Sequence, residues 1–191
     1  MKIAILGWGS LIWDRRKEFD GQHEDWQSDG PNLKLEFSRV SQTRCDALTL
    51  VLDAQNGTSC RVAYAISKRE NPDDAICDLR CREGTTLSKI GFYLADGTRG
   101  QSRDRESFAS IGAWAAGKKI DVVIWTDLES NFKDKGRCGK SFSIKNALCH
   151  IQALDAEGKA KAAEYVWRAP AFIDTPLRKA LQSQPWFPRH G

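Results

Sequence analysis

Hydrophobic residues in this chain occur mainly in short runs, which polar segments rich in glycine and charge separate. Such runs are typical of buried strands, because a buried helix is longer and repeats with a period of about 3.6 residues. The runs that predict strands are residues 2–6, 47–52, 60–67, 90–94 and 120–126. Leu33–Arg39 alternates apolar and polar positions, which predicts a half-exposed strand. A turn signal at residues 53–57 predicts that the strands between 33 and 67 form an antiparallel hairpin.

Helices are predicted where capping residues precede longer segments. Asn71 and Pro72 are followed by two aspartates, so a helix begins there and ends near residue 82, before Gly84. The other predicted helices cover residues 105–116 (ended by Gly117), 143–154, 159–167 and 175–178. The segments expected to be irregular are 14–32, 98–105 and 128–142, and the first of them is either a long loop or a loop with a short helix. Strands and helices do not alternate along the chain, so we predict a mixed α+β domain rather than a doubly wound parallel sheet.

Length and composition narrow this picture. The chain has 191 residues, of which 41% are hydrophobic and seven are tryptophan. One domain of about 100–200 residues accounts for this length, and its core needs neither disulfides nor metal. We therefore expect a single domain over residues 1–191, with an additional C-terminal tail from about residue 170. The aromatic content excludes a disordered chain.

Charge and hydropathy exclude two classes of partner. The net charge is only +4 and acids interrupt the basic residues, so we expect no nucleic-acid partner. No uncharged apolar stretch reaches the ~18–20 residues that a membrane helix needs, so we expect no membrane partner. The apolar stretch at residues 3–13 is followed by Asp14 and two arginines, not by the small residues of a signal-peptide cleavage site. We therefore predict a cytoplasmic protein.

The cysteines do not form a metal-binding pattern. They are Cys45, Cys60, Cys77, Cys81, Cys138 and Cys149. No pair has the two-residue spacing of a zinc knuckle, and the three histidines are far apart in sequence. We therefore predict free, buried thiols and no metal site.

Two glycines flank Trp8 directly after the first predicted strand, in the segment Leu6-Gly7-Trp8-Gly9-Ser10-Leu11. Glycine lets the backbone approach a ligand closely, and a turn here exposes successive N–H groups suited to a carboxylate or phosphate. The alternative is a tight turn that packs Trp8 and Trp13 into the core. Position 12 is isoleucine, so the segment is not a dinucleotide fingerprint, and it matches neither a P-loop nor a nucleophile elbow.

A glutamate at the end of the predicted helix is the second chemical candidate. Glu83 closes the segment Asp78-Leu79-Arg80-Cys81-Arg82-Glu83-Gly84. The C-terminal end of a helix is negative and disfavours a carboxylate, although the two arginines offset that cost. A carboxylate in such a place that points inward is a candidate general base. The alternative is a solvated surface glutamate.

Together, the two segments resemble the γ-glutamylcyclotransferase-like family, which includes the ChaC-like enzymes. LGWGSL is similar to the family's FGYGSL signature, and LRCREG is similar to the Leu-x-x-x-Glu-Gly segment that carries its catalytic glutamate. LTLVLD followed by CRVAYAIS is similar to the strand pair that leads to this helix. The resemblance covers residues 3–94 and, more loosely, 105–168. Trp8 stands where the family has tyrosine, and residues 128–142 and 170–191 have no counterpart.

The resemblance implies a small mixed β-barrel with peripheral helices, and an enzyme that converts a γ-glutamyl peptide or amine into 5-oxoproline and a free amine. It implies Glu83 as the general acid/base, and no metal or organic cofactor. The residues implied to bind the small-molecule γ-glutamyl substrate are Gly7, Trp8, Gly9, Ser10, Leu11 and Tyr93. The chemistry is intramolecular, because the α-amino group of such a substrate attacks its own γ-carbonyl. For Tyr93 the alternative is a strand aromatic in the core.

Two other readings stay open. The same scaffold suits a catalytically inactive module that binds a small ligand or a protein, with the glycine turn holding an anion and Glu83 serving only structure. A γ-glutamylamine-specific enzyme differs from the first reading only in its leaving group. The leaving amine and the oligomeric state are not determined by the sequence.

Overall fold

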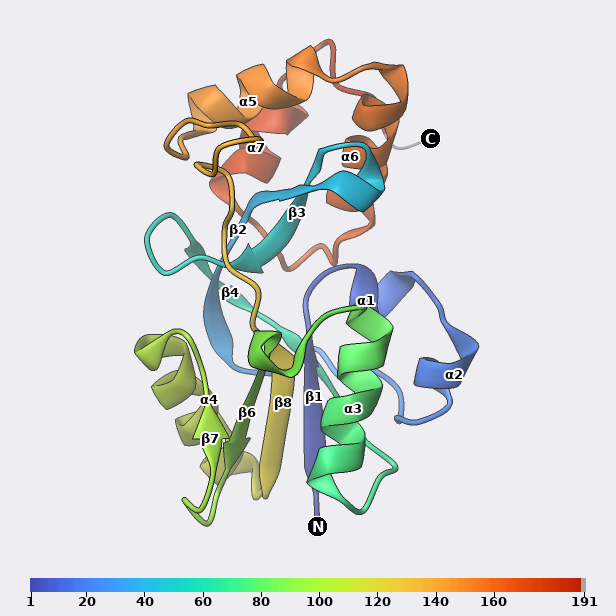
Figure 1. Cartoon of the computed structure of the whole chain (residues 1–191), viewed down its shortest axis with the longest axis vertical. Coiled ribbons are helices and arrows are strands. Elements are labelled where there is room, and N and C mark those ends of the chain that lie inside the picture. The colour runs from blue at the N-terminus through green and yellow to red at the C-terminus, as the bar shows by residue number, and fades with distance from the viewer. Residues whose placement is uncertain (190–191) are drawn as a thin grey trace. The chain divides into compact units, whose positions relative to one another are not determined.

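The computed structural model describes residues 1–189 of the chain (Figure 1). Its internal contacts divide it into two compact units. Unit 1 comprises Met1–Leu33 and Arg61–Leu128, and unit 2 comprises Lys34–Cys60 and Glu129–Gly191. The expected single domain stays a prediction, and residues 190 and 191 of the expected tail lie outside the described residues.

A mixed five-stranded sheet with the order β5-β1-β8-β6-β7 forms the centre of unit 1. Its strands are β1 (Ile3–Gly7), β5 (Ala63–Ile66), β6 (Ile90–Leu94), β7 (Gly100–Gln101) and β8 (Val122–Thr126). β1 pairs in parallel with β8 and antiparallel with β5, while β6 pairs antiparallel with both β8 and β7. The central strands β1 and β8 are almost wholly buried, as their uninterrupted apolar runs predict.

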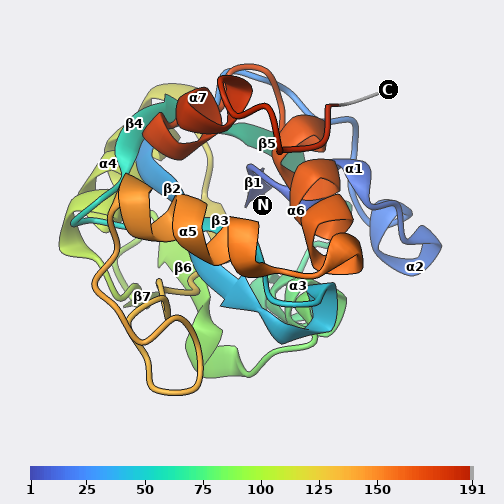
Figure 2. The ribbon, with the colours of Figure 1, turned by 90° about the horizontal axis from the view of Figure 1, so that it is seen from above.

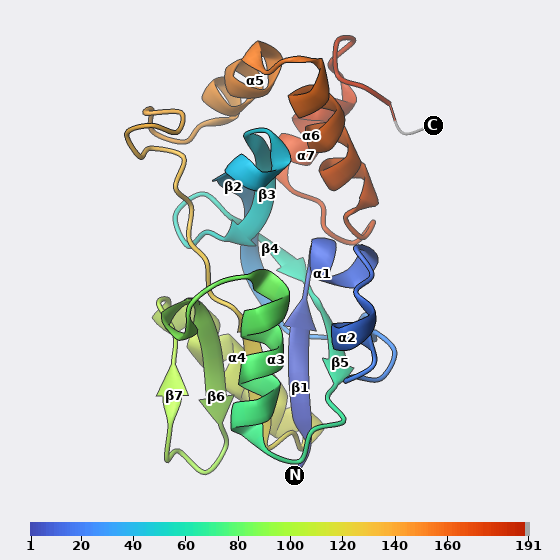
Figure 3. The same cartoon turned by 45° about the vertical axis from the view of Figure 1, so that its right-hand side comes forward.

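Helices cover both faces of this sheet, as Figures 1 and 3 show. α3 (Pro72–Glu83) packs over Ile3, Ile5 and Ile124, which belong to one buried cluster. Successive strand residues point to opposite faces, and α4 (Arg105–Lys118) packs on the other face of β6 and β8. The shorter helices of this unit are α1 (Ser10–Trp13), α2 (Lys17–Asp20) and the 3-10 turn η2 (Leu87–Lys89).

The caps explain where the two long helices begin and end. Asn71 accepts a hydrogen bond from the Asp73 N–H at 2.9 Å, which starts α3, and Gly84 ends it in the left-handed conformation with φ 59°. This confirms the helix predicted from residue 71 to about 82. α4 continues through Gly117 and ends where Lys119 turns left-handed, so the predicted stop at Gly117 is two residues early.

Unit 2 contains three helices and most of a three-stranded sheet with the order β3-β2-β4. The first two residues of β2, Asn32 and Leu33, and the last residue of β4, Arg61, belong to unit 1. The strands are β2 (Asn32–Ser41), β3 (Ala47–Leu52) and β4 (Thr58–Arg61), and the 3-10 turn η1 covers Gln42–Arg44. The helices are α5 (Ile144–Ala153), α6 (Ala156–Arg168) and α7 (Pro176–Gln182). α6 packs on β3, and α5 contacts both other helices, as Figure 2 illustrates.

The described part of the predicted tail contributes to the core of unit 2. Thr175 caps α7, and the buried apolar side chains that follow residue 170 are Ile173, Leu177, Leu181 and Phe187. Residues 128–142 are irregular, as expected, but Phe132 within them is fully buried.

The α+β class is confirmed, and four finer expectations are corrected, the last of them the small β-barrel that the resemblance implies. β2 is not half exposed, because the side chains of Glu36 and Ser38 are buried and hydrogen-bonded. The segment predicted as one strand at 60–67 divides at Val62 into β4 and β5, which belong to different sheets. β4 pairs with β2 rather than with β3, so only the β2–β3 part of the hairpin forms. The strands of residues 1–189 pair into two sheets, and no closed barrel is detected among them.

Candidate functional site

The glycine-flanked turn lies where β1 passes into α1. A Cβ at Gly7 would stand 2.7 Å from the ring of Trp26, so the Trp26 side chain requires glycine at this position. Gly9 caps α1, and its carbonyl accepts the Ile12 N–H at 3.0 Å. Trp8 is 6% exposed and Leu11 7%, so both contribute to the core. The burial of Trp8 agrees with the alternative interpretation, in which a tight turn packs this side chain into the core.

Arg82 connects this turn to the end of α3. Its Nη2 donates to the carbonyl oxygen of Ser10 at 3.1 Å and to that of Asp14 at 2.9 Å. The side chain is 4% exposed, and Nη2 also lies 3.6 Å from the Asp14 carboxylate. Burial lowers the pKa of the Arg82 guanidinium, and the neighbouring Glu83 carboxylate acts in the opposite direction. A buried guanidinium with carbonyl and carboxylate partners holds the turn firmly against α3.

Glu83 is the last residue of α3, beside this arginine. Its Oε1 lies 3.8 Å from Arg82 Nη1, and its side chain is 18% exposed. The chain turns away immediately after it, since the Thr85 N–H donates to the Arg80 carbonyl and Gly84 is left-handed. The structure therefore brings two segments more than 70 residues apart in sequence to one arginine.

Tyr93 lies on the other face of the sheet. It belongs to β6, where Phe92 packs into the cluster under α3 and the next side chain points to the opposite side. There the Tyr93 ring meets Phe108 of α4, edge to face, with centroids 5.5 Å apart. A Cβ at Gly112 would stand 3.0 Å from this ring. The structure thus does not bring Tyr93 to the turn or to Glu83.

Two residues of this region have roles that the sequence analysis missed. For Arg82, the sequence predicts only that it offsets the negative end of the helix. For Trp26, it predicts a position in an irregular segment and no role. The position of Arg82 directly before the candidate glutamate was the available signal. Nothing in the sequence around Trp26 indicates that its ring covers Gly7.

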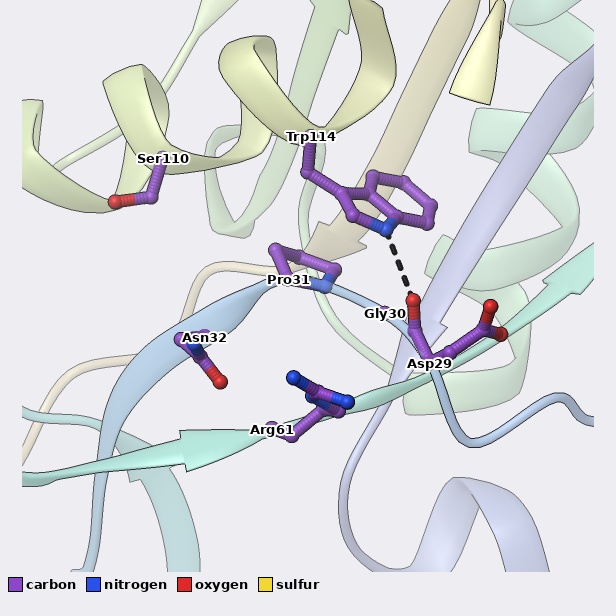
Figure 4. Close-up of a pocket in the computed structure, with 7 residues that line it drawn as sticks. All are labelled: Asp29, Gly30, Pro31, Asn32, Arg61, Ser110 and Trp114. Atoms are coloured by element: carbon purple, nitrogen blue, oxygen red, sulfur yellow. Dashed lines mark hydrogen bonds between the residues drawn. The ribbon is translucent and has the colours of Figure 1, made fainter. Parts of the chain in front are cut away.

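Unit 1 also holds a separate pocket of about 430 Å³ (Figure 4). Its lining residues are Asp29, Gly30, Pro31, Asn32, Arg61, Ser110 and Trp114. None of the predicted site residues lines it. Two of its lining residues, Ser110 and Trp114, belong to α4, which covers the face of the sheet opposite α3.

Within residues 1–189, no group of three or more His, Cys, Asp or Glu side chains is arranged to hold a metal ion. The six cysteines are free, and only Cys60 is buried, so the predicted burial of the thiols is wrong for the others. No helix among the described residues is both long enough and apolar enough to cross a membrane.

Comparison with known proteins does not assign the chain to a family. No protein-family model matches the chain, and no curated protein matches it. The resemblance to γ-glutamylcyclotransferase-like proteins therefore rests on the quoted motifs alone.

Proposed function

We propose that this chain is a γ-glutamylcyclotransferase-type enzyme of the cytoplasm, with Glu83 as its general acid/base and the Gly7–Leu11 turn at its substrate site. The substrate is a small γ-glutamyl peptide or amine, and the reaction needs no metal or organic cofactor. The family's small barrel is not part of the argument, because the described strands pair into two sheets. The proposal rests on the two motifs and their placement.

The single observation that carries the proposal is the pair of hydrogen bonds from Arg82 to Ser10 and Asp14. They support it because they hold the glycine turn next to the residue that the motif marks as catalytic. Glu83 is also partly exposed, as a group that must reach a substrate has to be.

The reaction follows from these groups. The Glu83 carboxylate takes a proton from the substrate's α-ammonium, and the freed nitrogen attacks the γ-carbonyl carbon to form the ring C–N bond. The tetrahedral intermediate carries its negative charge on the former carbonyl oxygen. The attacking nitrogen, now in the ring, still carries one excess proton. The bond to the leaving amine then breaks as Glu83 donates the proton it took to that nitrogen, and the ring nitrogen passes its excess proton to the released amine. The products are 5-oxoproline and the free amine in its ammonium form. Positioning contributes up to ~7–11 kcal/mol and proton transfer typically ~10²–10⁴-fold.

Release of 5-oxoproline tests the proposal. The purified chain is incubated with γ-glutamyl dipeptides, γ-glutamyl amines and glutathione, beside Glu83→Gln and the control Glu70→Gln, which changes an exposed glutamate ahead of α3. We expect turnover in the wild type and the control, and a loss of at least ~10²-fold in Glu83→Gln with binding retained. Equal turnover in Glu83→Gln refutes the role of Glu83.

The second candidate is a binding module on the same scaffold. It is favoured by the 3.8 Å approach of Glu83 to Arg82, since this carboxylate then has a structural partner. A folded wild type that releases no 5-oxoproline from any substrate of the panel supports this candidate instead. Turnover by the wild type excludes it.

A further inference from the structure

The pocket on the α4 side of unit 1 has a rigid floor. Gly30 and Pro31 are buried there, and the Gly30 N–H donates to the Val62 carbonyl at 3.0 Å. The Val62 N–H in turn donates to the Pro31 carbonyl at 3.0 Å. A Cβ at Gly30 would lie 2.5 Å from the Val62 oxygen, so only glycine permits this close pairing. The floor is therefore preformed, as small-molecule sites usually are.

One wall of the pocket is an aromatic ring held in place. The Trp114 Nε1 donates to the Asp29 carbonyl oxygen at 3.0 Å (Figure 4), and its ring contacts Tyr64 edge to face with centroids 4.9 Å apart. The hydrogen bond and the ring contact hold the indole in place, and its ring forms a flat apolar wall beside Pro31. Such a wall favours a planar apolar group.

The charge in the pocket is positive once the existing ion pair is taken into account. Lys118 pairs with the Asp29 carboxylate, and their hydrogen bond lowers the pKa of Asp29. Arg61 lines the pocket, and within residues 1–189 no ion pair or hydrogen bond engages its guanidinium. The Asn32 amide and the Ser110 hydroxyl are likewise without a hydrogen-bond partner among the described residues. Arg61 also acts electrostatically on Asp29, so two cations, Lys118 and Arg61, face a single carboxylate here. The pocket therefore offers a net positive charge and two further polar groups.

We propose that this pocket binds a small planar anion, namely an aromatic or heteroaromatic carboxylate. Its carboxylate pairs with Arg61 and the Asn32 amide, because a guanidinium binds a carboxylate through two parallel hydrogen bonds. Its ring lies against Trp114 and Pro31. The volume of about 430 Å³ fits such a ligand, since small-molecule pockets measure about 300–1,000 Å³. The site is independent of the proposed function, because α4 and Glu83 lie on opposite sides of the sheet.

Binding is tested without any activity assay, by NMR on the ¹⁵N-labelled full chain. Benzoate and indole-3-acetate are the probes, benzamide is the neutral comparator and acetate the comparator without a ring. The readouts are the Trp114 indole N–H, assigned through Trp114→Phe, and the Gly30 backbone N–H. We expect saturable shifts of both signals with at least one aromatic carboxylate, and affinity at least tenfold lower for benzamide and acetate.

Two variants locate the charge that is recognised. Arg61→Gln removes the proposed partner from an exposed position, and Arg105→Gln is the control, an exposed arginine on α4 outside the pocket. We expect at least tenfold weaker binding of the carboxylate in Arg61→Gln, with an otherwise unchanged spectrum, and no change in Arg105→Gln. The proposal is overturned if neither probe shifts the two signals saturably, if benzamide binds equally well, or if Arg61→Gln binds like the wild type.

Discussion

Arg82 of α3 donates a hydrogen bond from Nη2 to the backbone carbonyl of Ser10, at 3.1 Å and across 72 residues of sequence. The same nitrogen donates to the carbonyl of Asp14 at 2.9 Å. Backbone carbonyls in a tight turn have fixed directions, so a guanidinium that meets two of them determines how the turn is seated. This arginine is the structural link between the two motifs on which the proposed function depends.

Removing this link should destabilise the chain measurably. Arg82→Met keeps the length and apolar stem of the side chain but leaves the Asp14 carbonyl without its guanidinium donor. We expect the free energy of unfolding to fall by about 1–3 kcal/mol. Urea denaturation measures it, with Arg80→Met as the control on the same helix. Among residues 1–189, the Arg80 guanidinium donates hydrogen bonds only to the sulfurs of Cys77 and Cys81. Equal effects of the two substitutions would contradict the role assigned to Arg82.

Two glycines of unit 1 should respond to alanine in opposite directions. A Cβ at Gly91 would lie 2.1 Å from the ring of Trp125, its fully buried cross-strand neighbour, so we expect Gly91→Ala to destabilise by about 1–3 kcal/mol or more. Gly117 lies in α4 with no atom within 4 Å of its Cβ position, so Gly117→Ala should stabilise by about 0.5–1 kcal/mol. Thermal unfolding of both variants checks the signs, and a stable Gly91→Ala would be the contrary result.

The buried Glu36 should make unit 2 pH-sensitive. Burial raises the pKa of its carboxyl above the usual range, although Thr175 and the Phe37 N–H hydrogen-bond to it. Between its usual and its raised pKa, the folded state therefore holds more protons than the unfolded state. By linkage, the contribution of this group to stability is greatest at low pH and declines as pH rises through that interval.

Glu36→Gln removes this titration. The free energy of unfolding of the variant minus that of the wild type should increase as pH rises above the ordinary glutamate pKa. This trend holds whatever the difference between the two proteins at low pH. Urea unfolding at a series of pH values measures the difference, with exposed Glu70→Gln as the control. If the free energies of unfolding of wild type and Glu36→Gln changed with pH in parallel, Glu36 would have the same pKa in the folded and unfolded states, and the prediction would be wrong.

Thiol accessibility provides a further check. Cys77, Cys81 and Cys149 are exposed, whereas Cys60 is buried and burial raises the pKa of its thiol. A buried thiol with a raised pKa has little reactive thiolate, so Cys60 should react with a disulfide reagent only after unfolding. In the native protein, the exposed thiols react with the reagent in a rapid phase. We expect Cys60→Ala to leave the amplitude of this phase unchanged and Cys77→Ala to reduce it. A smaller rapid phase in Cys60→Ala would be inconsistent with this structure.

Local signals were sufficient for most elements of the fold. The Asn71 cap, Pro72 and Gly84 delimit α3 almost to the residue, because caps act within one turn of the chain. The segment predicted at 60–67 divides at Val62, because its two halves pair with strands distant in sequence, β2 and β1. No pattern within those eight positions could indicate a change of partner. The burial of Glu36 was missed for a similar reason, since its hydrogen bonds include one from Leu177, 141 residues away.

For the candidate site, the sequence by itself determined the positions of the glycine turn and of Glu83, because backbone geometry at glycine and at a helix end depends on neighbouring residues. The packing of segments distant in sequence brings Arg82 between them and places Tyr93 on the other face of the sheet, beside Phe108. The same packing brings Asn32, Arg61 and Trp114, which lie in three separate segments of the sequence, together around one pocket. The physical reason is that hydrogen bonds and ring contacts between distant segments depend on how strands pair and helices pack, which local patterns do not encode.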